Sequence, residues 1–179
     1  MRAWDLASSS KERDKDDPDA TVGMLGAVTF EPTTYEGEDG STHTMSMPHL
    51  WIKDTRWIQA EAPERNKMIR DVALLDGPGV RIYVEAFGAY KDAYTSLRKI
   101  LTGKAIVNKS ILQGDKSAKL ADVEPICDAG NIHIIRGPHD KKQIEQARAF
   151  PDGTHDDFMD PWAIIYHEST RPKGGLVVT

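Results

Sequence analysis

The chain has 179 residues, of which 39% are apolar and 28% charged, and its formal net charge is −5. This length suits a single domain spanning residues 1–179, and the acidic balance is unlike the basic composition typical of nucleic-acid-binding proteins. The single cysteine, Cys127, excludes an internal disulfide and a zinc site of several cysteines, and we interpret it as a small buried apolar residue. No apolar run is long enough to cross a bilayer and no signal-peptide core is present, so we expect an intracellular protein.

The first part of the chain is predicted to form strands before any helix. We expect strands over residues 2–8, 21–31 and 49–59, where β-branched and aromatic residues recur. Polar segments join them, and the glycine-bearing segment TTYEGEDGSTHT, residues 33–44, is predicted to be a turn region. Strands in this order favour an antiparallel meander.

From residue 62 the apolar residues adopt a helical period, and helices alternate with strands. The expected helices cover residues 62–77, 88–103, 116–130 with a break near Pro125, 141–150, and a last one from about residue 156. The expected strands cover residues 80–87, 104–112 and 131–137. The fold class is therefore α/β, with a mixed sheet that is antiparallel on one side, parallel on the other, and flanked by helices.

Acidic residues interrupt elements that are otherwise apolar. Asp5 lies inside AWDLA, Glu85 ends the strand RIYVE, and Asp156 and Asp157 open the last helix. A charge at such a position costs several kcal/mol unless it is paired or metal-bound. Arg2 is the base nearest to Asp5, but three residues along a strand it points to the opposite face. The segment 150–162 contains no Lys or Arg that could neutralise its aspartates.

A divalent metal site explains these acids together. If the first strand and the strand 80–87 are neighbours, Asp5 and Glu85 meet at the strand ends, where α/β sheets build their sites. The start of the last helix then closes the cluster. Mg²⁺ prefers oxygen ligands, and two such ions about 3.5–4 Å apart can hold a phosphodiester for hydrolysis. Each acid alone is more often a cap or turn residue, but their combination on separate elements favours a site.

Four segments resemble, in the correct order, the C-terminal nuclease domain of the large terminase subunits of tailed bacteriophages. They are RAWDLA, VEAFGA, QGDKSAKLADVEPICDAGNIHIIRG and ARAFPDGTHDDFMD, and the last is the most specific. The resemblance covers almost the whole chain. It implies an RNase H-like fold and a metal-dependent endonuclease, with two Mg²⁺ or Mn²⁺ ions, that cuts double-stranded viral DNA during genome packaging. It also implies a phage or prophage protein in the cytoplasm of a bacterial host.

The resemblance also assigns residues. The implied catalytic triad is Asp5, Glu85 and Asp157. Asp156 and Asp160 are implied as further metal ligands, and His155 as an auxiliary residue that orients a carboxylate or a water. The residues themselves leave the choice between Asp156 and Asp157 open, because neighbours on a helix point about 100° apart. The resemblance favours Asp157.

The sequence departs from the family in three respects, the first being that AFGAYKDA, after Glu85, lacks the Pro-Gly commonly seen there. Pro161 stands where these proteins often have Ala, so the last helix must begin later or the aspartates must lie in a tight first turn. The chain also contains no G-x-x-x-x-G-K-[ST] phosphate loop, so we expect a nuclease domain without the ATPase motor. The partners implied by the family are double-stranded DNA, a terminase ATPase domain, the small terminase subunit and the portal, with no membrane.

The net charge of −5 conflicts with DNA binding. Basic residues are concentrated over residues 98–119, and we expect Lys116 and Lys119 to contact phosphates, a solvated face being the alternative. Two other functions remain open. One is another RNase H-like nuclease, specific for DNA junctions or RNA–DNA hybrids. The other is a catalytically idle packaging module that only binds proteins.

Overall fold

The structure, a computed structural model of the chain, describes residues 1–7, 20–85, 91–110, 112 and 114–171. Its strands are β1 (Arg2–Asp5), β2 (Thr21–Glu36), β3 (Thr42–Ile58), β4 (Ile82–Glu85), β5 (Val107–Ser110) and β6 (Ile132–Ile134). Its helices are α1 (Ala62–Asp76), α2 (Lys91–Ile100), α3 (Lys116–Leu120), α4 (Glu124–Asp128), α5 (Asp140–Ala149) and α6 (Met159–Thr170). Within the described residues, no helix combines the length and the apolar character needed to cross a membrane.

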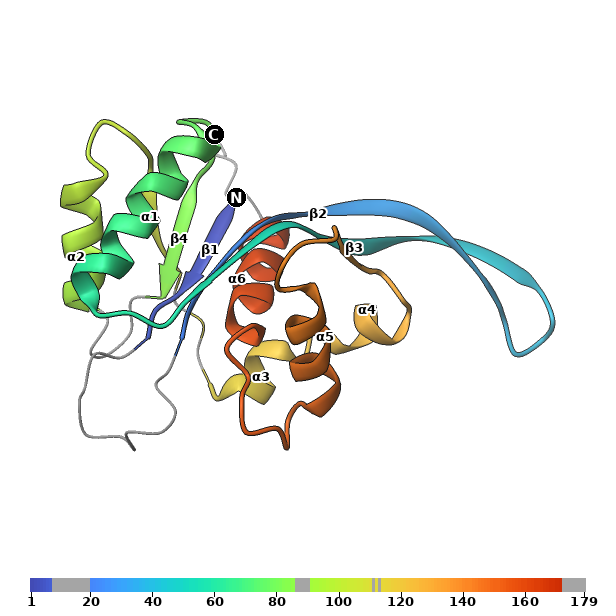
Figure 1. Cartoon of the computed structure of the whole chain (residues 1–179). Coiled ribbons are helices and arrows are strands. Elements are labelled where there is room, and N and C mark those ends of the chain that lie inside the picture. Colours follow the sequence, from blue (N-terminus) through green and yellow to red (C-terminus); the bar gives the residue numbers. More distant parts are fainter. Residues whose placement is uncertain (8–19, 86–90, 111, 113, 172–179) are drawn as a thin grey trace, which may run out of the picture.

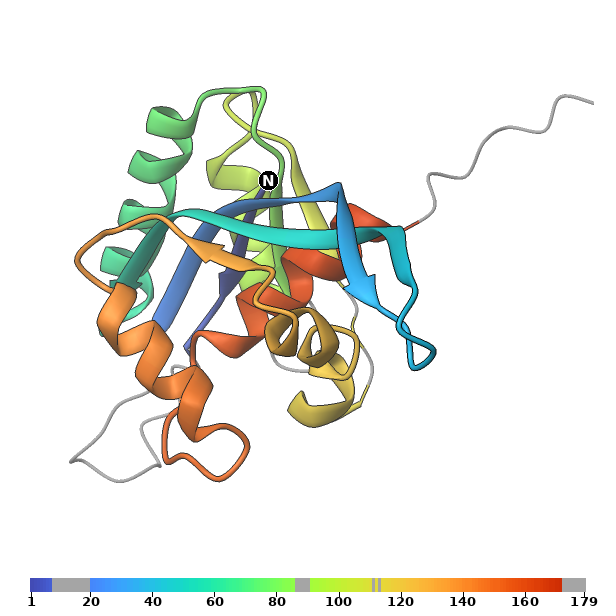
Figure 2. The same ribbon diagram turned by 90° about the vertical axis from the view of Figure 1, so that its right-hand side faces the viewer.

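The strands form one mixed sheet in the order β5-β4-β1-β2-β3-β6 (Figure 1). β1, β2 and β3 are antiparallel neighbours, whereas β4 is parallel to β1 and β5 is parallel to β4. β6 adds a parallel edge beside β3 (Figure 2). The predicted fold class is therefore confirmed, and the arrangement is consistent with an RNase H-like fold.

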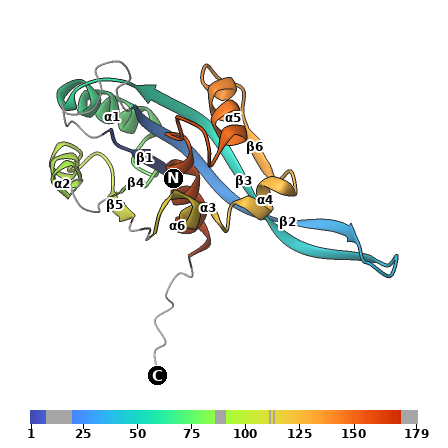
Figure 3. The ribbon, with the colours of Figure 1, turned by 90° about the horizontal axis from the view of Figure 1, so that it is seen from below.

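β1 lies in the middle of the sheet and separates two apolar layers. On one face, Ala3 packs with the α6 residues Trp162 and Ile165. On the other face, Trp4 packs with Ile69 of α1 and Leu97 of α2. Figure 3 shows α1 and α2 on one side of the sheet and α6 on the other. Because successive strand residues point to opposite faces, the two apolar residues of β1, Ala3 and Trp4, contribute one side chain to each layer.

The indole of Trp4 explains the glycine opposite it on β2. Trp4 and Gly23 are partners in the antiparallel pairing, and the ring covers the space that a Cβ at Gly23 would need. Only glycine allows this approach. The close contact brings β1 and β2 together in the centre of the sheet.

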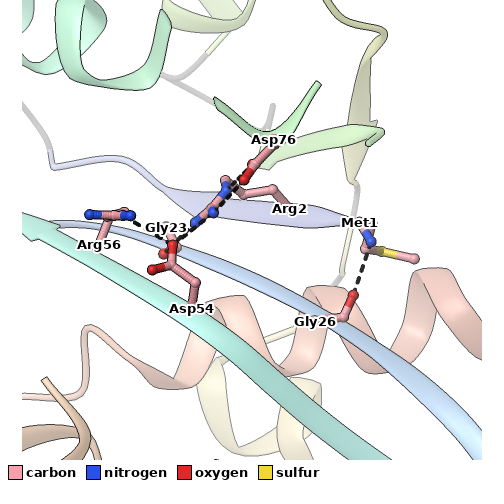
Figure 4. A network of polar contacts seen from close by, with 7 residues as sticks. All are labelled: Met1, Arg2, Gly23, Gly26, Asp54, Arg56 and Asp76. Carbon is pink, nitrogen blue, oxygen red and sulfur yellow. Dashed lines mark hydrogen bonds and ion pairs between the residues drawn. The ribbon is translucent and has the colours of Figure 1, made fainter. Parts of the chain in front are cut away.

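An ion-pair network connects the sheet with the end of α1 (Figure 4). The Arg2 side chain is only 1% exposed, and its Nη2 donates to Asp54 Oδ2 at 2.8 Å and to Asp76 Oδ1 at 2.9 Å. Its Nη1 donates to the carbonyl of Gly23 at 3.3 Å. Arg2 thus lies away from Asp5, and its partners come from β3 and α1.

β2 and β3 extend as a long hairpin, which we call the arm, beyond the part of the sheet that the helices cover (Figure 1). Their pairing continues to Glu36 and Thr42, so the predicted turn region 33–44 is wrong except for its centre. Threonine and aromatic residues favour strands, and the glycines Gly37 and Gly40 confine the turn to a few residues. Large apolar side chains are exposed on the arm, including Phe30, Tyr35 and Met45.

One helix prediction needs correction. The last helix begins at Met159 instead of residue 156, which is the later start that Pro161 indicated, so Asp156 and Asp157 precede it and Pro161 falls in its first turn, where a missing N–H does no harm. The helix predicted over 116–130 with a break near Pro125 is divided as expected into two short helices, α3 and α4, and Pro125 lies in the first turn of α4.

The prediction that Cys127 is buried is wrong, because the residue is exposed. On α4 the buried position belongs to Ile126. Adjacent residues on a helix point about 100° apart, so burial of one leaves the next near the surface.

Candidate metal centre

Three carboxylates from three elements converge at one end of the sheet. Asp5 and Glu85 end the parallel neighbours β1 and β4, whose register pairs Trp4 with Val84 and so places the two acids at the same level. Asp160 comes from the first turn of α6. One carboxylate oxygen from each of the three lies within 4.8 Å of those from the other two. The cluster is partly shielded, because the side chain of Asp160 is only 6% exposed and that of Glu85 only 16%.

In the described part of the chain, Asp157 is not a member of this mutually close trio. Asp157 lies in the turn before α6, half-buried, and burial raises the pKa of its carboxyl group while the Gln146 side chain and Lys116 oppose the rise. The charge of Asp157 nevertheless acts on Asp5. The geometry thus offers Asp160 as the third acid, and the catalytic role of Asp157 stays a prediction.

Two other acids of the segment 150–162 have different surroundings. Asp156 is half-buried and pairs with Lys116, whereas Asp152 is exposed. His155 acts electrostatically on Asp157 and opposes the rise of its pKa. The sequence segment 150–162 therefore splits into an exposed part and a part that faces the cluster.

Asp5 has the most unfavourable surroundings of the three acids. Burial raises the pKa of its carboxyl group well above the ordinary value, Asp160 raises it further, Lys116 opposes the rise, and Glu85 and Asp157 add to it. Among the described residues, none donates a hydrogen bond to this carboxylate. A carboxylate in such surroundings is stabilised either by protonation or by a neighbouring cation.

We expect Asp5→Asn to stabilise the metal-free protein. Because the pKa of Asp5 is higher in the folded than in the unfolded chain, the folded protein keeps a proton that the unfolded chain loses. The free energy of unfolding should therefore fall as pH rises from about 4 towards the folded-state pKa. Asn does not titrate, so it should remove the contribution of Asp5 to this slope and add about 1–3 kcal/mol at neutral pH. Urea unfolding in EDTA across this pH range measures both effects, and a less stable variant at neutral pH would contradict them.

Two lysines of α3 neutralise the acids. Lys119 Nζ lies 2.8 Å from Glu85 Oε1 and 3.1 Å from Asp160 Oδ1. Lys116 Nζ lies 2.6 Å from Asp156 Oδ1 and 3.1 Å from Asp160 Oδ2. Burial lowers the pKa of both ammonium groups, but the surrounding carboxylates outweigh it and raise the pKa overall. Lys116 and Lys119, predicted as phosphate contacts, thus face the acids in this structure.

The GDK segment explains how α3 presents these lysines. Gly114 has φ +96°, a conformation that favours glycine, and turns the chain into the helix. Asp115 then caps the helix, its Oδ1 accepting from the amide of Ala118 at 2.9 Å. Lys116 and Lys119 follow with a spacing of three, which places both on one face of α3. This spacing is the signal in the sequence that the two lysines act together.

The residues fit a divalent cation. Three carboxylates are the hard oxygen ligands that Mg²⁺ and Mn²⁺ prefer. Oxygens that share one Mg²⁺ at about 2.1 Å lie at most about 4.2 Å apart. The trio, with its oxygens within 4.8 Å of one another, therefore needs only small side-chain rotations to bind one.

A scan against known protein families and a search of curated proteins found no match to this chain. The resemblance to terminase nucleases therefore rests on the quoted segments of the sequence alone.

Proposed function

We propose that this chain is a metal-dependent endonuclease that hydrolyses phosphodiester bonds of double-stranded DNA. The observation that carries the proposal is the convergence of Asp5, Glu85 and Asp160 at adjoining strand ends of an α/β sheet. These side chains would hold Mg²⁺ or Mn²⁺. When bound, two such ions supply Lewis-acid activation of water and stabilisation of the leaving oxygen. We further propose that cleavage leaves a 5′ phosphate and a 3′ hydroxyl.

The chain's own residues have distinct parts in this proposal. Asp5 and Glu85 are fixed by the hydrogen-bonded strands β1 and β4, so their carboxylates have little freedom to move apart. Asp160 approaches from α6, whose apolar residues Trp162 and Ile165 anchor the helix in the core. Carboxylates held rigidly in this way would favour in-line attack by water on one phosphodiester.

The biological setting is proposed from the sequence resemblance. The chain would cut concatemeric DNA during packaging of a phage or prophage genome in the host cytoplasm. Its partners would be a terminase ATPase domain, the small terminase subunit and the portal. Because the net charge is −5, we expect this chain alone to bind DNA weakly. The partners would supply most of the affinity for DNA.

One observation favours a second candidate, an idle packaging module. Lys116 and Lys119 already neutralise Glu85, Asp156 and Asp160, and a protein that never binds metal could keep its acids in this way. The two candidates differ in whether the cluster binds a divalent ion at all.

The function is tested by incubating the purified chain with linear duplex DNA, a four-way junction and an RNA–DNA hybrid. We expect cleavage of the duplex with Mn²⁺ or Mg²⁺ and none after EDTA treatment. Strong preference for the junction or the hybrid would replace the duplex-specific assignment. Absence of cleavage together with absence of Mn²⁺ binding in calorimetry would support the idle module.

A further inference from the structure

We propose that Lys116 and Lys119 are resident counter-cations that a divalent ion must displace from the acids before the site is loaded. The displacement would free both ammonium groups for a DNA phosphate. This inference rests on the proposed function, because it concerns the loading of the same site. It assigns the two α3 lysines a role in regulating the affinity for metal.

The contacts of Asp160 carry the inference. Its Oδ1 lies 3.1 Å from Lys119 Nζ and its Oδ2 lies 3.1 Å from Lys116 Nζ, so both oxygens already have a cationic partner. Glu85 Oε1 has one as well, at 2.8 Å from Lys119 Nζ. Lys119 therefore bridges two members of the acid trio from the position that a shared cation would take.

An ammonium group and a divalent ion exclude each other here. Lys119 holds its two oxygens at 2.8 and 3.1 Å, whereas Mg²⁺ holds its ligands at about 2.1 Å. The trio must contract to bind the ion, and an ion that takes the two oxygens now held by Lys119 leaves no room for the ammonium between them. The two cations also repel each other, and screening by solvent is weak because the Lys119 side chain is only 10% exposed.

The lysine side chains can leave while their helix stays in place. α3 is capped by Asp115, and the carbonyl of Lys119 is hydrogen-bonded to His167 Nε2 of α6 at 2.9 Å. Four-carbon stems allow the ammonium groups to rotate away without movement of this backbone. They would then lie beside the loaded site, where a phosphate needs positive charge.

The central test is Mn²⁺ titration calorimetry on Lys119→Met, which keeps the length of the stem and removes the charge. We expect Mn²⁺ to bind about tenfold more tightly than to the wild-type protein. Lys119→Arg, which keeps the charge, should stay near the wild-type affinity. Lys141→Met is the matched control, because the side chain of Lys141 is 86% exposed and its ion pair is with Glu145 in the same helix. Unchanged or weaker binding by Lys119→Met would overturn the inference.

A second measurement keeps the test decisive if Lys119→Met is unstable. Loss of the lysine leaves the acids to repel one another, so the metal-free variant should melt below the wild-type temperature. Saturating Mn²⁺ should then raise its Tm by more than it raises that of the wild type. An equal or smaller rise would overturn the inference.

The outcomes separate the inference from the proposed function. Tighter Mn²⁺ binding by Lys119→Met without DNA cleavage by the wild type would support the lysine role and contradict the proposed nuclease activity. DNA cleavage by the wild type, with equal Mn²⁺ affinity in both proteins, would support the proposed nuclease activity and contradict the lysine role. Failure of both proteins to bind Mn²⁺ would remove both.

Discussion

Asp160→Asn is expected to reduce Mn²⁺-dependent DNA cleavage about a thousandfold or more. The substitution preserves the shape of the side chain but removes the charge that closes the trio with Asp5 and Glu85. A bound metal contributes several kcal/mol to the transition state, and each 1.36 kcal/mol is a factor of about ten in rate. Single-turnover cleavage of a supercoiled plasmid measures the loss, and circular dichroism reports whether the variant is folded.

Two further variants sharpen this result. Asp152→Asn is the control, because Asp152 lies in the same segment but is exposed and outside the trio, and its activity should match the wild type. Asp157→Asn tests the residue that the sequence resemblance favours. If Asp157→Asn loses more activity than Asp160→Asn, the third ligand is Asp157 and the carboxylates must rearrange when metal binds. Full activity of Asp160→Asn would remove Asp160 from the proposed mechanism.

Arg2→Met is expected to lower the free energy of unfolding by about 3–5 kcal/mol. Arg2 is 1% exposed and is the partner of Asp76, whose side chain is only 9% exposed, and of Asp54. Removing the guanidinium leaves a buried carboxylate at the end of α1 without its cation, which is far more costly than the loss of a surface pair. Urea unfolding, followed by circular dichroism, measures the change.

The matched control is Arg56→Met. Arg56 Nε donates to the same Asp54 oxygen at 3.0 Å, but its side chain is 46% exposed, so its loss should cost at most about 1 kcal/mol. The double variant Arg2→Met with Asp76→Leu should recover part of the stability lost by Arg2→Met, because the buried carboxylate that lost its cation is then removed as well. Equal destabilisation by Arg2→Met and Arg56→Met would show that the burial of Arg2 has little energetic consequence.

The sequence was sufficient to predict the fold class and the meeting of Asp5 with Glu85. Both acids end strands whose apolar pattern is unambiguous, and parallel neighbours place their ends at one edge of the sheet. The long hairpin was missed because its glycines and polar residues resemble a loop. Only the cross-strand pairing, which runs through Tyr35 and His43, shows that it is a strand.

The third acid and its partners depend on packing that local patterns indicate only in part. Pro161 indicates a late start for the last helix, which begins at Met159, but how α6 packs determines that Asp160 and not Asp157 joins the trio. The pairing of Lys119 with Glu85 spans 34 residues of sequence. Local spacing indicates that two lysines share a face, but the packing of α3 against α6 determines what that face meets.

Among the described residues, no further strand lies beside the outer edges of the arm formed by β2 and β3, since β1 pairs with β2 only up to Leu25 and β6 pairs with β3 only from Leu50 to Ile52. Free edges of this kind invite strand addition by other polypeptides, which ends in aggregation. Pro32 and Pro48 interrupt the row of amide donors, one in each strand, and Glu31 and Glu36 add negative charge. These prolines and negative charges therefore oppose edge-to-edge association at their positions in the arm.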